Sequence, residues 1–268
     1  MFKILFGSVM GIYDIILSDF KSLISKKDKK IPKKFLNEFT MNGKIKVIYK
    51  FRDDAYPKSK PIVFSKIDIE HLITEIKKGK LLSYYGKTDV YLSQAFKKYS
   101  SIIKNSAVLD IGSVTGRYSA FALAYGASES YVLEYNNLIS EYKKIKILNY
   151  DTIKSFYNKF NVATSISSFE HDGLGRYGDS INPNGDIQAM KFIKHVIKKG
   201  GILFLVVPVG RDKLVWNLHR VYGKLRLPKL LVGWELIDSF GFNENDLDNE
   251  NKHLYYGSHQ PVFVLKRI

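Results

Sequence analysis

The stretch AVLDIGSVTGRYSAFALAYGASESYVLEYN, residues 107–136, decides the fold of this 268-residue chain. It opens with an apolar run typical of a buried parallel strand, which has Asp110 near its carboxyl end. Gly112 and Gly116 bracket the next turn, and glycine there lets backbone amides approach a ligand. Apolar residues at helical spacing follow, and a second strand-like run ends at Glu134. This order of strand, glycine turn, helix and strand is typical of half of a nucleotide-cofactor site.

The acid at the end of the second strand supports that interpretation. Glu134 lies 24 residues after Asp110, about the separation at which such an acid reaches a ribose diol. The Gly-x-Gly-x-x-Gly fingerprint of dinucleotide-binding domains is absent near the start of the chain. A strand-helix-strand unit whose glycines only form a turn is the simpler alternative.

Apolar runs alternate with helical segments as far as the C-terminus. Strands are predicted over 144–148, 162–168 and 202–207, with a final antiparallel pair over 234–242 and 261–266. Asp186 is predicted to cap the helix before the 202–207 strand. Before the glycine turn, the pattern predicts a short strand over 44–51 and a loop over 55–61. The whole pattern predicts an α/β protein.

The glycine turn and the acid after it resemble motif I and the acidic loop of class I S-adenosylmethionine-dependent methyltransferases. The run FIKHVIKKGGILFLVVP, residues 192–208, resembles the helix, Lys-x-Gly-Gly turn and fifth strand of the same fold. The resemblance implies a Rossmann-like, mostly parallel seven-stranded sheet whose last strand is antiparallel. It also implies a mainly helical N-terminal extension over residues 1–83 and an α/β domain over residues 84–268.

The same resemblance implies S-adenosylmethionine as the cofactor and a set of residues that would bind it. These residues are Asp110, Gly112, Gly116, Glu134 and Asp151. Asp151 follows the third strand, where an acid in this fold often meets the adenine amino group. Val114 stands where the methyltransferases usually have a middle glycine, which implies a reshaped pocket at the methionine-carboxylate end.

A second resemblance rests on longer and more specific strings. The run EHDGLGRYGD, residues 170–179, and the segment 207–242 are similar to a bacterial family known as domain of unknown function 268. The likeness covers roughly residues 84–242. Members of that family resemble methyltransferases and are associated with cell-surface polysaccharide biosynthesis. The resemblance therefore implies a sugar or nucleotide-linked sugar as the substrate.

The run 170–179 follows the fourth predicted strand, where open α/β sheets place the crevice that holds the substrate. His171 is the expected catalytic base, and Asp172 orients it or serves instead. Arg176 is expected to bind a phosphate or carboxylate of the substrate, with Tyr177 and Asp179 beside it. The simpler alternative is that these side chains cap and pack the loop.

A second polar and aromatic cluster follows the fifth predicted strand. At i, i+3 and i+4 spacing, Trp216, His219 and Arg220 would share one face of a helix that roofs the pocket and contacts the sugar. The alternative is that Trp216 belongs to the ordinary core.

Composition excludes several other chemistries. The chain has no cysteine, and its six histidines form no His-x-x-x-His pair, so no metal site is expected. The Gly-x-Ser-x-Gly and P-loop motifs of hydrolases and nucleotide hydrolases are absent as well. The net charge of +16 comes mainly from dispersed lysines, and no nucleic-acid-binding module is legible. Nucleic acid is therefore not the expected partner.

The N-terminus suggests two alternatives. Residues 1–24 are mostly apolar but interrupted by charges, and residues 26–34 add the basic run KKDKKIPKK. The interruptions argue against a membrane-spanning helix. The segment is expected to pack on the domain or on a second subunit of a homodimer; alternatively it lies on an anionic inner membrane surface. A cytoplasmic protein, peripheral to the membrane in the second case, is expected.

Three hypotheses for the function follow. The first is methyl transfer from S-adenosylmethionine to a sugar hydroxyl. The second is the same fold serving another activity on an activated sugar, or binding one. The third is an accessory subunit at the membrane surface, which uses its basic N-terminus to dock on a glycan-synthesis complex.

Overall fold

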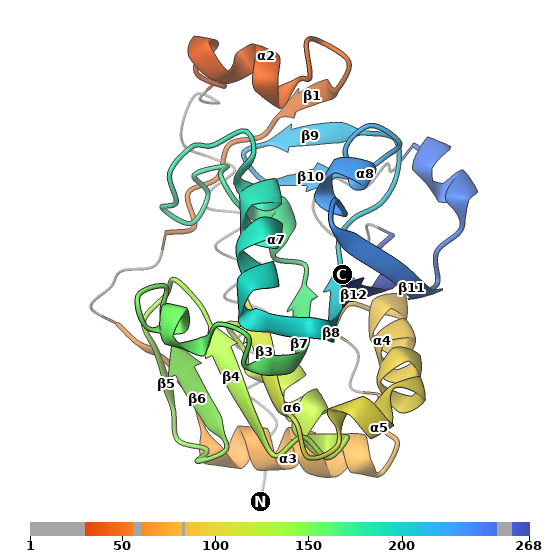
Figure 1. Cartoon of the computed structure of the whole chain (residues 1–268). Helices are drawn as coiled ribbons and strands as arrows, with labels where there is room; N and C mark the ends of the chain where they lie inside the picture. The colour runs from red at the N-terminus through yellow and green to blue at the C-terminus, as the bar shows by residue number, and fades with distance from the viewer. Residues whose placement is uncertain (1–29, 56–59, 82–83, 251–258) are drawn as a thin grey trace, which may run out of the picture.

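The computed structural model describes residues 30–55, 60–81, 84–250 and 259–268 (Figure 1). Seven strands of this described part form one sheet in the order β11-β12-β8-β7-β3-β4-β6. Their bounds are β3 (Ala107–Ile111), β4 (Glu129–Leu133), β6 (Ile145–Leu148), β7 (Phe160–Ile166), β8 (Ile197–Val206), β11 (Trp234–Phe240) and β12 (Val262–Arg267). Strands β6, β4, β3, β7 and β8 are parallel, and β12 runs antiparallel to both β8 and β11. The predicted sheet with an antiparallel last strand is confirmed.

Helices cover both faces of this sheet because its central strands are apolar on both sides. One face packs on α3 (Lys66–Lys77), α4 (Lys87–Lys98), α5 (Ser100–Ile103) and α6 (Arg117–Ala124). The other face packs on η2 (Thr152–Phe156), α7 (Gly185–Val196) and α8 (Leu227–Leu230). Neighbouring residues of β3 divide accordingly, since Val108 belongs to the first core cluster and Leu109 to the second.

A separate three-stranded sheet lies beyond the carboxyl ends of the main strands, at the top of Figure 1. It joins β1 (Lys46–Tyr49) in parallel to β9 (Lys213–Trp216), which pairs antiparallel with β10 (His219–Val221). Its core includes Phe39, at the end of α2 (Leu36–Phe39), and is extended by η1 (Lys33–Phe35). The strand predicted over 44–51 is therefore present as β1.

Two local predictions are wrong. The segment that holds Trp216, His219 and Arg220 is not a helix, because strand β1 pairs with β9 and the β-branched Val215 suits the sheet. Asp186 is not the cap of α7 either. The N-cap is Asn184, and the Asp186 carboxylate is buried in the first turn, where it accepts hydrogen bonds from Arg226.

The N-terminal part of the chain also reaches the main domain from the opposite side. Strand β2 (Ile62–Phe64) pairs in parallel with β5 (Leu138–Ser140), and α3 packs against α6. Short turns η3 (Phe169–His171) and η4 (Glu244–Asp248) complete the described elements. The predictions for residues 1–24 and for residues 26–29 of the basic run lie outside the described residues. None of the described helices is both long and apolar enough to cross a lipid bilayer.

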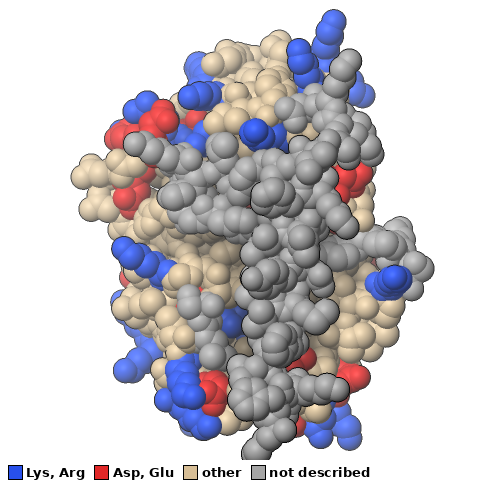
Figure 2. Space-filling model, turned by 180° about the vertical axis from the view of Figure 1, so that it is seen from behind, with Lys and Arg blue, Asp and Glu red and all other residues tan. Residues whose placement is uncertain are grey.

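The surface carries its charges in groups of both signs. In the reverse view of Figure 2, the visible Lys and Arg side chains lie in separate clusters with Asp and Glu among them. The visible, described part of that face therefore presents no single continuous basic surface.

Candidate functional site

The site lies at the carboxyl ends of β3, β4, β6 and β7, where open α/β sheets bind their ligands. Asp110 sits in this region but faces the interior. Its carboxylate accepts hydrogen bonds from Ser119 Oγ at 2.7 Å and Thr164 Oγ1 at 3.3 Å. Burial raises the pKa of Asp110 to about 6, although hydrogen bonds from hydroxyls oppose the rise. Asp110 thus ties the glycine turn to α6 and β7 from inside the protein.

Both glycines of the turn are required by their surroundings. Gly112 has φ +75°, and a Cβ there would lie 2.0 Å from Ser168 Oγ. Gly116 has φ +65°, and a Cβ there would lie 2.8 Å from Ile69 Cδ1. Between the two glycines, the Ser113 side chain is buried and its hydroxyl helps to lower the pKa of Asp110. The turn therefore packs tightly on its outer sides.

Glu134 follows β4 and is only 8% exposed. Its Oε1 accepts three hydrogen bonds, from the amides of Tyr135 (2.8 Å) and Asn136 (3.1 Å) and from Asn136 Nδ2 (2.9 Å). Burial raises the pKa of the carboxyl, while these donors favour its charged form. No described residue donates to Oε2. The arrangement holds one carboxylate oxygen in place and leaves the other available to a hydroxyl donor.

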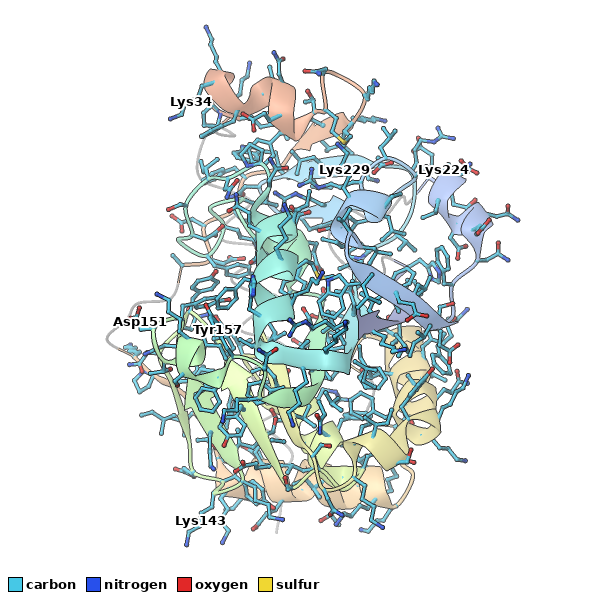
Figure 3. The ribbon with its side chains drawn as sticks, in the orientation of Figure 1. Lys34, Lys143, Asp151, Tyr157, Lys224 and Lys229 are labelled. Atoms are coloured by element: carbon cyan, nitrogen blue, oxygen red, sulfur yellow. The ribbon has the colours of Figure 1, made fainter. Side chains whose placement is uncertain are left out.

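Two tyrosines lie beside Glu134. Tyr135 follows β4 and Tyr150 follows β6, and their rings stack with centroids 4.2 Å apart and planes 12° apart. Asp151, the predicted adenine contact, is exposed, and Figure 3 shows it at the edge of the molecule. This aromatic pair was not predicted from the sequence, although a tyrosine follows each of the two neighbouring strands closely.

The loop after β7 brings Glu170 and His171 together. Ser167 Oγ donates to Glu170 Oε1 at 2.5 Å, and His171 Nε2 lies 3.7 Å from the same oxygen. The other oxygen, Glu170 Oε2, is buried and has no partner. Burial raises the pKa of Glu170 to about 7. No catalytic role was predicted for Glu170 from the sequence.

His171 is held as a neutral imidazole. Its Nδ1 lies 2.5 Å from the carbonyl oxygen of Leu218 and must donate, because a carbonyl only accepts. Burial lowers the pKa of His171 well below its ordinary value, and Arg176 and His219 lower it further. The lone pair is therefore on Nε2, which faces Glu170. His219 lies close by, with ring centroids 6.4 Å apart, and its own buried Nε2 has no partner.

The remaining charged residues of the 170–179 run hold the loop. Asp179 Oδ2 accepts from the amides of Gly173 at 2.8 Å and Gly175 at 3.1 Å. Arg176 donates to Asp54 Oδ2 at 2.7 Å and lies over the Tyr177 ring. Burial raises the pKa of Asp172 well above its ordinary value. Of the predicted substrate residues in this run, Tyr177 is the one that offers an exposed ring, 5.6 Å from His171.

The second predicted cluster is buried. Trp216 packs edge-on against Phe39 in the core of the small sheet. Arg220 donates to the backbone oxygens of Asp172 at 2.7 Å and Glu170 at 3.3 Å. These contacts hold the loop after β7 in place, so the small sheet positions the Glu170–His171 side of the site. Among the described residues, no group of His, Asp and Glu has the spacing of a metal site.

The strand order and the site at the carboxyl edge define the Rossmann-like fold of class I methyltransferases. The chain belongs to the family described as "Caenorhabditis protein of unknown function, DUF268", whose model matches residues 105–268. That description refers to Caenorhabditis and to an unknown function. It therefore gives no support to the bacterial source and polysaccharide role that the sequence resemblance implied.

The solved structures that match this chain are only distantly similar to it. A 1,6-didemethyltoxoflavin N1-methyltransferase from Burkholderia thailandensis, with bound 1,6-didemethyltoxoflavin and S-adenosylhomocysteine, is 16% identical over 74% of this chain and 89% of its own, with a TM-score of 0.45. An S-adenosylmethionine-dependent methyltransferase from Mesorhizobium loti is 12% identical over 66% of this chain and 98% of its own, with a TM-score of 0.43. A comparison with curated proteins gave no match.

Proposed function

We propose that this protein is an S-adenosylmethionine-dependent methyltransferase whose acceptor is a hydroxyl of a sugar or a nucleotide-linked sugar. The observation that carries the proposal is the Glu134 carboxylate, which is held by three donors through Oε1 and has Oε2 free beside the Tyr135–Tyr150 ring pair. The acceptor class rests on the resemblance of the run 170–179 to domain of unknown function 268.

The residues at the carboxyl edge suit the cofactor. Glu134 Oε2 would accept from the ribose hydroxyls, and the tyrosine pair would stack on the adenine ring. The turn from Gly112 to Gly116 would offer backbone amides, as it does in this class of fold. When bound, S-adenosylmethionine supplies an activated methyl group.

The Glu170–His171 pair supports the acceptor half of the proposal. A general base must lie within about 2.6–3.2 Å of the proton that it takes. Neutral His171 offers the Nε2 lone pair for a hydroxyl proton, while Leu218 keeps Nδ1 protonated. Once Nε2 is protonated, the adjacent Glu170 carboxylate would stabilise the imidazolium. Asp172 was the alternative base, but burial favours its neutral form.

Tyr177 supports a sugar as the acceptor. Its ring is partly exposed and stands edge-on to His171. An aromatic face beside hydrogen-bonding groups suits a sugar ring, which has apolar C–H faces and polar edges. Tyr177 would then position the hydroxyl relative to His171.

Calorimetric titration with S-adenosylmethionine and S-adenosylhomocysteine tests the cofactor. We expect micromolar binding, weakened at least tenfold by Glu134→Ala. Glu129→Ala is the matched control, because Glu129 lies at the other end of β4 and pairs with Lys146. Absence of binding up to millimolar concentrations would refute the proposal.

Methyl transfer from labelled S-adenosylmethionine to a panel of nucleotide sugars tests the acceptor. His171→Gln should abolish transfer and leave cofactor affinity unchanged, since His171 faces the acceptor side. Cofactor binding without transfer to any sugar of the panel would contradict the acceptor class and leave the cofactor assignment in place.

A further inference from the structure

Two oppositely charged side chains are buried together beside the glycine turn. Asp89 lies in the first turn of α4 and is 0% exposed, and Arg117 is the first residue of α6 and is 7% exposed. Arg117 Nε lies 3.9 Å from Asp89 Oδ1. That separation gives electrostatic attraction but exceeds the length of a hydrogen bond.

The facing atoms of this pair have no hydrogen-bond partners. Asp89 uses Oδ2 to accept from the amides of Tyr84 at 2.5 Å and Tyr85 at 2.6 Å, but Oδ1 accepts nothing. Arg117 leaves both Nε and Nη2 unpaired, and the nearby Tyr118 hydroxyl is unpaired as well. Buried charged atoms without partners are destabilising, and each such case in a native protein requires an explanation.

The pair lies beside the glycine turn of the candidate site. Arg117 directly follows Gly116, the last glycine of the turn. Asp89 in turn holds the amides of Tyr84 and Tyr85. The Asp89–Arg117 pair is therefore next to the turn that would hold the cofactor.

We propose that Asp89 and Arg117 bind the two charges of an α-amino acid group. The Nε and Nη2 edge of a guanidinium matches the two oxygens of a carboxylate. Asp89 Oδ1 would accept from the α-ammonium, which carries three donors. The ligand would thus satisfy the three unpaired atoms and separate the two side chains.

This inference rests on the proposed function, because the aminoacyl end of S-adenosylmethionine is such a group. It assigns to two side chains the recognition that the backbone near Val114 would otherwise provide. Both charges lie on helices that cover the same face of the sheet, α4 and α6, which are in contact through Phe96 and Phe121.

The experiment compares two ligands that differ only at this end. S-adenosylhomocysteine carries the amino acid group, and 5′-deoxy-5′-methylthioadenosine keeps the nucleoside and the thioether without it. Isothermal calorimetry on the full chain should show that S-adenosylhomocysteine binds at least tenfold more tightly. Arg117→Met and Asp89→Asn should each reduce this ratio to about one and leave the affinity for methylthioadenosine unchanged.

The control is Glu134→Ala, which should weaken both ligands by the same factor. Equal affinity of the unmodified protein for the two ligands would overturn the inference and leave the proposed function standing. Failure of both ligands to bind would refute the two together. Thermal unfolding of each variant identifies loss of the fold. A ratio that stays unchanged in folded Arg117→Met and Asp89→Asn would also overturn the inference, because the backbone would then provide the recognition.

Discussion

Replacing Gly112 with alanine should destabilise the protein by about 2–5 kcal/mol. Two terms add. A residue with a Cβ at φ +75° costs about 1–2 kcal/mol. The added Cβ would also lie 2.0 Å from Ser168 Oγ and 2.6 Å from Ser168 Cβ, and such overpacking costs typically about 1–3 kcal/mol.

A matched glycine separates the two terms. Gly200 has φ +78°, but no atom lies within 4 Å of the Cβ position. Gly200→Ala should therefore cost only the conformational term of about 1–2 kcal/mol. Adding Ser168→Gly to Gly112→Ala should recover the steric term, because it removes both clashing atoms.

Urea unfolding at equilibrium measures five free energies, those of the unmodified protein, Gly112→Ala, Ser168→Gly, their double variant and Gly200→Ala. The double-mutant cycle over the first four gives the coupling between positions 112 and 168. We expect a coupling of about 1–3 kcal/mol. A Gly112→Ala variant no less stable than Gly200→Ala would refute the close contact between the glycine turn and the loop after β7. A coupling near zero would refute it as well.

Three further predictions follow from buried charges and rings. Burial raises the pKa of Glu170 from 4.5 to about 7, so the stability that the neutral carboxyl contributes is present below pH 4.5 and lost as the pH rises through 7. Glu170→Gln should therefore stabilise the protein by up to about 3 kcal/mol at pH 8 and much less at pH 5, as measured by urea titration. Equal effects at the two pH values would contradict the assigned burial. Arg226→Met should lower the free energy of unfolding by about 3–5 kcal/mol, because Arg226 donates to the buried Asp186 carboxylate at 2.6 and 2.9 Å. Lys224, labelled in Figure 3, forms an exposed pair with Asp248, and Lys224→Met should cost at most about 1 kcal/mol by the same assay. Similar losses of stability in the two variants would be evidence against the buried pair. Tyr150→Leu should weaken S-adenosylhomocysteine binding about three- to tenfold, measured by calorimetry, because the stacked ring is lost. Tyr157 lies on the outer surface, so Tyr157→Leu should leave the affinity unchanged. A larger loss of affinity in Tyr157→Leu than in Tyr150→Leu would exclude the tyrosine pair as the adenine contact.

The local pattern of the sequence was sufficient for the main sheet. The strand before Gly112, the helix before Gly126 and the strand before Glu134 were all predicted. The two strands contain short apolar runs, the helix has apolar residues at helical spacing, and a glycine or an acid follows each element. The region around Trp216 was misread, because its helix-like spacing was overruled by pairing with β1, more than 160 residues away in the sequence.

The candidate site also contains some residues that local sequence predicts and others that it does not. Glu134 and His171 stand out locally, since each follows a strand. The Asp89–Arg117 pair could not be predicted, because the two residues belong to different helices and only the packing of α4 on α6 brings them together. Arg220 and Asp179 were taken for substrate contacts, although both use their donors or acceptors on the backbone of the loop.

The pairing of β1 with β9 constrains the order in which the protein is made. Asn217 exchanges two hydrogen bonds with the backbone of Arg52, at 2.7 and 2.9 Å, across 165 residues. At roughly 5–20 residues per second, β1 is synthesised about 8–33 s before its partner strand. During that interval its edge is open to wrong pairing, and the loop over Glu170 and His171 lacks the brace that Arg220 provides. The site can therefore be completed only late in synthesis, and a chain arrested before β9 would hold the glycine turn without the acceptor half.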